Sequence, residues 1–417
     1  MMKRLVFGMI GFGVMAGLAG ADEWVRFRGP NGSGVNEGAL IPAEWNKSDY
    51  KWSVDLPGVG HGAPVIWEDR IFVLCGDDEK GTRMPVCLDA ETGKVLWSEE
   101  FTPGNSKRHR YNSVAATTPA VDEERVYFSW GDKESLILMA FTHGGDEVWE
   151  ADLGSVSGGH GFGASPVVYG DLLVLNNDQE GEENGFLVAL DRETGEEAWR
   201  VDRESKRISY STPVVYELGD EKGEVLVFTN WTHGFTAVDP TSGEVVAEKS
   251  VFYQETNERA ISSPIAYNDL VLGTCGFTKN PKHAVAMKLD AGGDFEEVWR
   301  IERSVPHIPS PIFVNDLVFL WDDGGIVTCV EPATGNVKWR ERVEAKGEVY
   351  GSPVSDGEKI FSVDKEGVVS VIAADDEFEV LAQNDLGELC RSTPAIADGV
   401  LYIRTHGKLH AIQGQKG

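Results

Sequence analysis

Basic and aromatic side chains recur at one kind of position in this chain, shortly ahead of a repeatedly used proline. They are His61, Arg108, His160, Arg207, Tyr210, Arg259, His307, Tyr350 and Arg391. Guanidinium, imidazole and phenol groups bind carboxylates, phosphates and sugar hydroxyls through hydrogen bonds. If these residues converge, they would form a funnel for a small anionic or polyhydroxylated ligand. The alternative is that the histidines bond loop carbonyls and the arginines pair with Glu258 or Glu388.

No catalytic residue and no metal ligand can be assigned beside them. No Ser-His-Asp set can be placed, and the histidines would bind a metal only if the fold brought them together. The segment from Asn176 to Glu182 is rich in oxygen ligands, but its spacing is not that of a calcium-binding loop, and we interpret it as a solvated loop. The segment from Gly29 to Gly34 lacks the lysine of a phosphate-binding loop, so we predict that it is part of a strap.

The proline belongs to a phrase that occurs eight times, in which a small residue, usually Ser or Thr, precedes the proline and an apolar run follows it. These prolines are Pro64, Pro119, Pro166, Pro213, Pro264, Pro311, Pro353 and Pro394, so the spacing is 41 to 55 residues. A period in this range indicates a repeat architecture. The first repeat contains four short apolar segments, at residues 64–66, 70–75, 86–88 and 95–101. Four antiparallel strands without a helical period predict one blade of a β-propeller.

The two ends of the chain are predicted to close the ring. The last repeat has three strands, and residues 51–56 resemble a missing fourth strand, with Trp52 at the position that Trp97 has in the first repeat. We therefore predict an all-β, eight-bladed propeller of four-stranded antiparallel blades at residues 51–417, preceded by an N-terminal strap at residues 22–50. A tryptophan on each fourth strand should pack on the next blade, so the two blades with Ala247 and Ala382 there are predicted to have the loosest seams.

The first 21 residues have the features of a signal peptide. A short basic start precedes an apolar stretch, and residues 19–21 (Ala-Gly-Ala) form a small-residue cleavage site without a cysteine that could carry a lipid. We predict an exported monomer, periplasmic or secreted, with no membrane span. Its 68 acidic and 38 basic side chains disfavour nucleic acid as a partner. The five cysteines are predicted to be buried and free. The alternative is a disulfide between Cys75 and Cys87, which lie on neighbouring predicted strands.

Two of the repeats resemble a known pattern. The segments Cys87–Trp97 and Ala189–Trp199, which share Leu-Asp-x-Glu-Thr-Gly and end in tryptophan, are similar to the tryptophan-docking repeat of pyrroloquinoline-quinone (PQQ)-like propellers. That superfamily includes the quinoprotein alcohol dehydrogenases and the outer-membrane assembly factor BamB. The opening segment Trp24–Gly34 resembles the start of exported bacterial propellers whose role is undefined. The resemblance implies the fold over roughly residues 51–413.

The resemblance implies no activity by itself. Quinoprotein dehydrogenases have two adjacent cysteines over the quinone and a set of calcium ligands, and neither feature can be placed in this chain. A PQQ cofactor with calcium is therefore disfavoured. The function that we expect is an exported, non-catalytic binding or scaffolding propeller that presents its channel face to a small ligand or an envelope protein. The alternatives are a PQQ-dependent alcohol or sugar dehydrogenase and a subunit of an envelope assembly complex.

Overall fold

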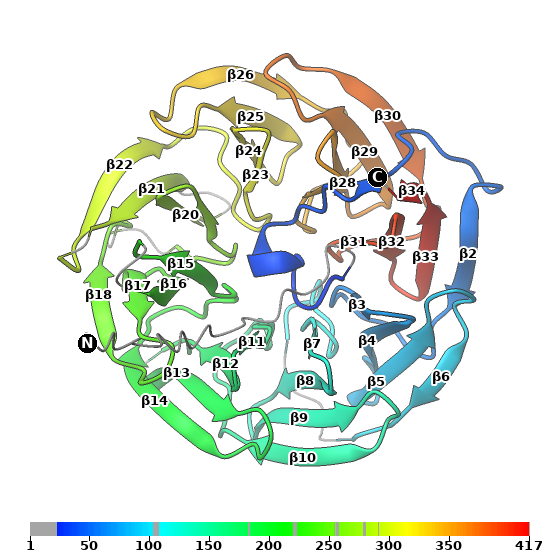
Figure 1. Cartoon of the computed structure of the whole chain (residues 1–417), viewed down its shortest axis with the longest axis horizontal. Coiled ribbons are helices and arrows are strands. Elements are labelled where there is room, and N and C mark those ends of the chain that lie inside the picture. The colour runs from blue at the N-terminus through cyan, green and yellow to red at the C-terminus, as the bar shows by residue number, and fades with distance from the viewer. Residues whose placement is uncertain are drawn as a thin grey trace, which may run out of the picture.

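The computed structural model describes residues 23–416, with gaps at 103–107, 182–183, 220–222, 254, 256–257, 278–280 and 291. The predicted signal peptide lies outside these residues. Eight four-stranded antiparallel sheets stand around a common centre as the blades of a propeller (Figure 1). This confirms the predicted fold class. No helix among the described residues is long and apolar enough to cross a membrane.

The first four blades follow one another along the chain. Blade one contains β3 (Val65–Trp67), β4 (Arg70–Asp77), β5 (Thr82–Asp89) and β6 (Val95–Ser98). Blade two contains β7 (Ala120–Val121), β8 (Arg125–Gly131), β9 (Leu136–Thr142) and β10 (Glu147–Asp152). Blade three contains β11 (Val167–Tyr169), β12 (Leu172–Asn177), β13 (Asn184–Asp191) and β14 (Glu197–Glu204). Blade four contains β15 (Val214–Glu217), β16 (Glu224–Asn230), β17 (Gly234–Val238) and β18 (Val245–Lys249).

The remaining blades repeat this plan. Blade five contains β19 (Ile265–Tyr267), β20 (Leu270–Cys275), β21 (His283–Leu289) and β22 (Phe295–Ile301). Blade six contains β23 (Ile312–Val314), β24 (Leu317–Trp321), β25 (Ile326–Val330) and β26 (Val337–Arg342). Blade seven contains β27 (Val354–Ser355), β28 (Lys359–Val363), β29 (Val368–Ala373) and β30 (Val380–Asp385). Blade eight contains β31 (Ala395–Ala397), β32 (Val400–Arg404), β33 (Lys408–Gln413) and β2 (Tyr50–Asp55).

The ring is closed by an exchanged strand, as predicted. Strand β2 pairs antiparallel with β33, with Trp52 opposite Ala411 and Val54 opposite Leu409. The chain ends meet a second time where β1 (Ala39–Leu40) pairs with β34 (Gln415–Lys416). Both pairings join residues from opposite ends of the chain, so they close the ring.

The tryptophans of the fourth strands fasten each blade to the next. The indole N–H of Trp52 donates to the carbonyl of Ala90 in blade one at 3.0 Å, and the ring covers Gly93 so closely that a Cβ there would lie 2.7 Å from it. The same tryptophan–glycine contact recurs in four further pairs, Trp97–Gly145, Trp149–Gly195, Trp199–Gly243 and Trp299–Gly335. Glycine is required because a side chain would displace the indole, and these glycines also have positive φ.

Two seams lack the tryptophan. Ala247 of blade four shares a hydrophobic cluster with Phe235 and with Phe295 of blade five, whose rings lie 5.8 Å apart. Ala382 of blade seven packs against the cluster that contains the strap residue Trp45. Blade eight has no turn between its third and fourth strands on which a tryptophan could dock, because these strands come from the two chain ends. That these seams are the loosest stays a prediction.

The strap crosses the ring and ties distant blades together. Arg26 donates to the carbonyl of Pro213 in blade four at 2.6 Å, and Arg28 donates to the carbonyl of Pro311 in blade six at 2.7 Å. The short 3-10 turn η1 (Pro30–Gly32) lies near the middle of the ring (Figure 1). Both arginines are buried. The segment that we predicted as a strap therefore closes one end of the central channel.

The interpretation of residues 176–182 as a solvated loop is wrong for its described part. The side chains of Asn176, Asn177, Asp178 and Gln179 are buried. The Asp178 carboxylate receives two hydrogen bonds from the buried guanidinium of Arg203, at 2.7 and 2.5 Å. A buried charge is tolerated because it is paired in this way. All five cysteines are buried and free, as predicted, and Cys75 and Cys87 form no disulfide.

Candidate functional site

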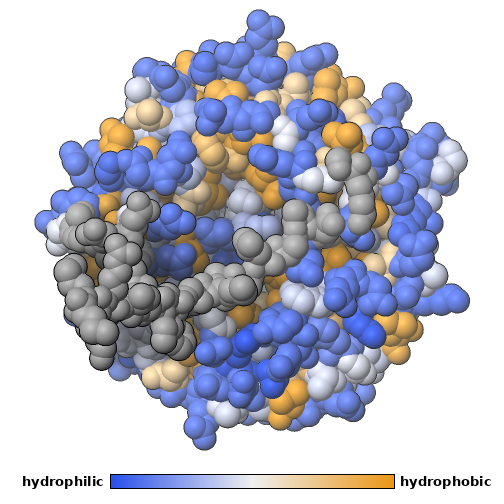
Figure 2. All heavy atoms as spheres, in the orientation of Figure 1, coloured by the Kyte–Doolittle hydropathy of each residue, from blue (hydrophilic) through white to orange (hydrophobic). Residues whose placement is uncertain are grey.

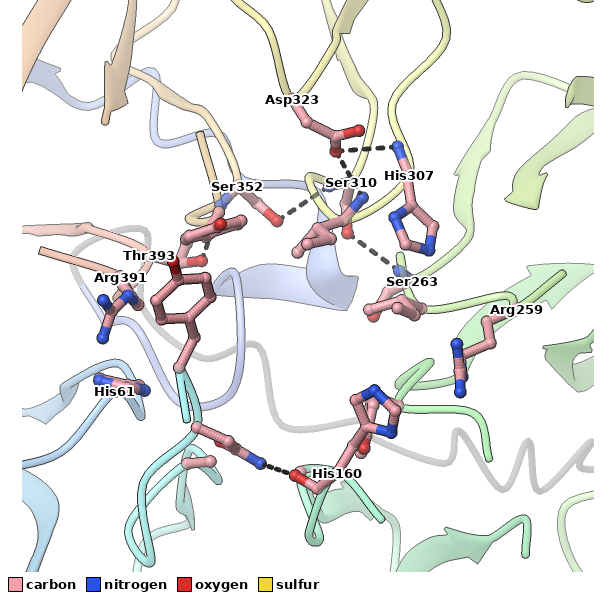
Figure 3. Close-up of a pocket in the computed structure, with 18 of the residues that line it drawn as sticks. His61, His160, Arg259, Ser263, His307, Ser310, Asp323, Ser352, Arg391 and Thr393 are labelled. Atoms are coloured by element: carbon pink, nitrogen blue, oxygen red, sulfur yellow. Dashed lines mark hydrogen bonds between the residues drawn. The ribbon is translucent and has the colours of Figure 1, made fainter. Parts of the chain in front are cut away.

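A cavity of about 550 Å³ occupies the centre of the ring. The links that enter the blades form its walls, and Phe27 of the strap contributes to its lining. Figure 3 shows side chains from opposite blades pointing into this space, with His61 and Arg391 facing His307 and Arg259 across it. The volume falls in the range of small-molecule sites. The face of the molecule that Figure 2 shows is mostly hydrophilic.

A ring of hydroxyl groups lines the cavity, and it comes from the repeated phrase. At six of the eight seams, the residue ahead of the blade-entry proline uses its backbone N–H to donate to the hydroxyl of the equivalent residue in the next blade. Six such bonds form, at 2.9–3.0 Å: Ala63 to Thr118, Thr118 to Ser165, Thr212 to Ser263, Ser263 to Ser310, Ser310 to Ser352, and Ser352 to Thr393. Since each oxygen already accepts an amide N–H, its own proton is the group left to donate toward the cavity. The floor of the cavity is therefore rich in hydrogen-bond donors.

Seven of the nine predicted site residues line the cavity. They are His61, His160, Tyr210, Arg259, His307, Tyr350 and Arg391. The other two predicted residues lie outside it. Arg108 pairs with Asp78 at 3.2 Å, and Arg207 pairs with Glu180. Glu180 is the carboxylate that holds both Arg207 and Arg259.

Among the described residues, Arg391 is the charged side chain of the cavity lining that has no partner of opposite charge. Arg259 pairs with Glu180 at 3.1 Å. Of the two carboxylates in the lining, Asp323 faces the ammonium of Lys282, and Glu348 faces that of Lys365 at 3.0 Å. Arg391 has no carboxylate partner among the described residues, and its guanidinium lies 4.9 Å from the centre of the Tyr111 ring. A cation without an acidic partner attracts an anionic ligand.

Three histidines of the cavity, His61, His160 and His307, have a pKa below the ordinary value of histidine. Burial, and then the charge of Arg391, lower the pKa of His61 to about 3. Burial lowers the pKa of His307 to about 4, and burial and then the charge of Arg259 lower the pKa of His160. Burial also raises the pKa of Tyr210, whose hydroxyl donates to the carbonyl of Gly161 at 2.9 Å. These groups are therefore hydrogen-bonding partners for a ligand and carry no charge of their own.

Sequence reasoning missed part of the lining. The missed residues are Phe27, His109, Tyr111, Asn112, Phe277, Asp323 and Glu348, together with the hydroxyl ring. His109 and Tyr111 follow Arg108 directly, and the hydroxyls belong to the repeated phrase itself, so both had a signal in the sequence. Nothing in the sequence distinguishes Phe27, because its place depends on how the strap folds over the ring.

The residues do not fit a calcium ion beside a quinone. Calcium requires several converging oxygen ligands, and usually carboxylates. Both carboxylates of the lining face lysine ammonium groups, and the other oxygen atoms of the lining are mostly neutral hydroxyls. Among the described residues, no group of three His, Cys, Asp or Glu side chains is arranged to hold a metal. We therefore derive no step through calcium.

The fold and the cavity define an eight-bladed propeller with a blocked central channel, and comparison with known proteins identifies its family. The family described as outer membrane protein assembly factor BamB matches residues 45–178, 136–275 and 282–417. The chain belongs to this family of PQQ-like propellers, as the repeats predicted. BamB of Moranella endobia (strain PCIT) is 23% identical over 361 residues, which cover 84% of each chain.

Quinone alcohol dehydrogenases are also related. The dehydrogenase subunit of the Gluconacetobacter polyoxogenes enzyme is 33% identical over 256 residues, which cover 53% of this chain and 31% of that subunit. The match therefore spans less than a third of that relative. Among solved structures, BamB from Moraxella catarrhalis has a TM-score of 0.62 at 13% identity and covers 87% of this chain and 96% of that one. The quinohemoprotein alcohol dehydrogenase from Comamonas testosteroni has a TM-score of 0.63 at 14% identity, with coverages of 95% and 81%. At these identities the structural likeness shows the fold alone.

Proposed function

We propose that the protein is an exported, non-catalytic binding propeller whose central cavity takes a small anionic or polyhydroxylated ligand. The observation that carries the proposal is the donor-rich cavity, in which a hydroxyl ring and the unpaired guanidinium of Arg391 face the same space. Tyr111, Tyr350 and Phe277 add aromatic surfaces on which a sugar ring can pack. Export rests on the predicted signal peptide, and a monomer is expected.

A ligand screen by thermal shift tests this proposal. Small acids, sugars and sugar acids are added to the wild-type protein and to Ala116→Trp, in which a bulky side chain fills the cavity from a lining position. A compound that binds in the cavity raises the melting temperature of the wild type in proportion to its concentration. The same compound should leave Ala116→Trp unchanged. Compounds that stabilise both proteins equally, or none across the screen, would contradict a cavity-binding function.

The relation to quinone alcohol dehydrogenases makes a PQQ-dependent dehydrogenase the second candidate. Titration with the quinone and calcium, followed by absorbance and by dye reduction with alcohols, tests it. An absorbance change with turnover would replace the binding proposal by this one. The relation to BamB over 84% of both chains favours a third candidate, a subunit of an envelope assembly complex. Recovery of a stoichiometric envelope partner by co-purification at native expression would support it.

A further inference from the structure

Among the described residues, two of the eight seams lack a bond of the hydroxyl ring: the one between blades three and four, where Thr212 does carry a hydroxyl, and the one between blades eight and one, where the hydroxyl itself is missing. By the rule that holds in six other seams, the backbone N–H of Thr393 should donate to a hydroxyl on residue 63, but that residue is Ala63. The N–H of Thr393 has no acceptor among the described residues. Ala63 has an exposed fraction of 1%, so the neighbouring wall is closely packed. An oxygen atom supplied by a ligand would complete the ring at this point.

The same seam holds the unpaired cation of the cavity. Arg391 lies two residues ahead of Thr393, and its buried Nε has no hydrogen-bond partner. His61, two residues ahead of Ala63, presents a buried Nε2 that is also without a partner. Figure 3 shows Arg391, Thr393 and His61 on one side of the cavity. Three polar groups without hydrogen-bond partners among the described residues thus lie in the links that enter blades eight and one: the Nε of Arg391, the N–H of Thr393 and the Nε2 of His61.

The surroundings of the seam are positively charged although the protein is strongly acidic. Arg404 is fully buried behind it and donates to the carbonyls of Gly62 and Leu74, at 2.9 and 2.7 Å. Arg391 and Arg404 both act on His61 in the direction that disfavours its protonation. Across the cavity, Arg259 shares the single carboxylate of Glu180 with Arg207. Arg391 and Arg404, neither of which forms an ion pair with a carboxylate among the described residues, thus place two positive charges at this seam.

We propose that this seam is an oxyanion subsite for a sugar acid, which is a carboxylate or phosphate group on a hydroxylated carbon skeleton. The oxyanion binds Arg391 and the N–H of Thr393, and His61 donates or accepts the next hydrogen bond. The skeleton extends over the hydroxyl ring, whose protons and remaining lone pairs suit sugar hydroxyls. The inference rests on the proposed function and names its ligand class.

Calorimetric titration with glucuronate, glucose 6-phosphate and glucose tests the subsite in the whole protein. The wild type should bind at least one of the two acids more tightly than glucose, and the comparison of the acids distinguishes carboxylate from phosphate. Arg391→Met should weaken binding of the acid by about tenfold to a hundredfold and should leave glucose unchanged, since a hydrogen bond to a charged group is lost. Arg342→Met, on the outer strand β26, removes the same charge far from the seam and should have no effect.

A second variant tests the interruption of the ring without changing the charge. Ala63→Ser supplies the missing hydroxyl to the N–H of Thr393, so it should weaken binding of the acid several-fold and should not lower the melting temperature. The subsite is overturned if acids and glucose bind the wild type equally, if neither acid binds at millimolar concentration, or if Arg391→Met keeps the preference for the acid. Binding of a neutral sugar alone would overturn this inference and still support the proposed function.

Discussion

The contact between Trp52 and Gly93 joins blade eight to blade one, where the ring closes, and its contribution to stability can be predicted quantitatively. Gly93 has a φ of +69°, and a Cβ there would lie 2.7 Å from the indole of Trp52. Gly93→Ala therefore combines a backbone cost of about 1–2 kcal/mol with an overpacking cost of about 1–3 kcal/mol. The expected loss in the free energy of unfolding is about 2–5 kcal/mol. Gly387→Ala is the matched control, because Gly387 has a φ of +75° and no heavy atom within 4 Å of its Cβ position.

A double-mutant cycle separates the two costs. Trp52→Ala alone should destabilise by about 3–5 kcal/mol, since a large buried ring and the hydrogen bond to Ala90 are lost. In the double variant the methyl group at position 93 no longer meets the indole, so the combined loss should be smaller than the sum by about 1–3 kcal/mol. Urea unfolding followed by circular dichroism measures all four proteins. Additive losses, or a Gly93→Ala no costlier than Gly387→Ala, would refute the tryptophan–glycine closure.

Three further predictions concern buried polar groups. Asp178→Asn should destabilise the protein by about 3–5 kcal/mol in urea unfolding, because it leaves Arg203 buried and unpaired; a loss below about 1 kcal/mol would contradict this. Burial lowers the pKa of His61 to about 3 and that of His410 to about 4. Below pH ~6.5 the unfolded state therefore binds more protons than the folded state, and the free energy of unfolding should fall as the pH falls from about 7 to about 4. The fall should be less steep in His410→Gln. The five buried thiols should react with Ellman's reagent only after unfolding, and a fast reaction of the native protein would argue against their burial.

The fold could be predicted because its determinants are local and repeated. Each blade carries its own strand pattern and its entry proline, and six of the eight carry the tryptophan. The contact partner of that tryptophan lies one repeat further along the chain, as in the pair Trp149 and Gly195. The closure could be predicted for the same reason, since residues 50–55 have the pattern of a fourth strand and blade eight lacks one. Eight copies of one pattern are stronger evidence than any single copy.

The cavity could be predicted only in outline. That the blade-entry links converge follows from the fold, and seven of the nine expected residues do line the space. Which side chains carry a free charge depends on partners that the repeat does not specify. Asp323 and Lys282 come from different blades and meet at the wall, and nothing in either segment indicates the other. The hydroxyl ring was not predicted although it is visible in the repeat. The Ser or Thr ahead of the blade-entry prolines was interpreted as part of the scaffold, and its hydroxyl also lines the cavity.

Two expectations near blade three were wrong for the same reason: the solvated loop at residues 176–182 and the position of Arg207 in the cavity lining. Residues 176–180 look like a polar surface loop, so no buried partner was expected from them, and Arg207 was left free to enter the cavity. In the folded chain the loop turns inward, Asp178 is held by Arg203, and Glu180 reaches both Arg207 and Arg259. Glu180 thus holds Arg207 outside the cavity lining and also pairs with Arg259 in it. Among the described residues, no carboxylate pairs with Arg391, whose guanidinium instead lies against the Tyr111 ring. The loop that carries Glu180 therefore supplies a counter-charge on one side of the cavity, and no equivalent loop does so at Arg391.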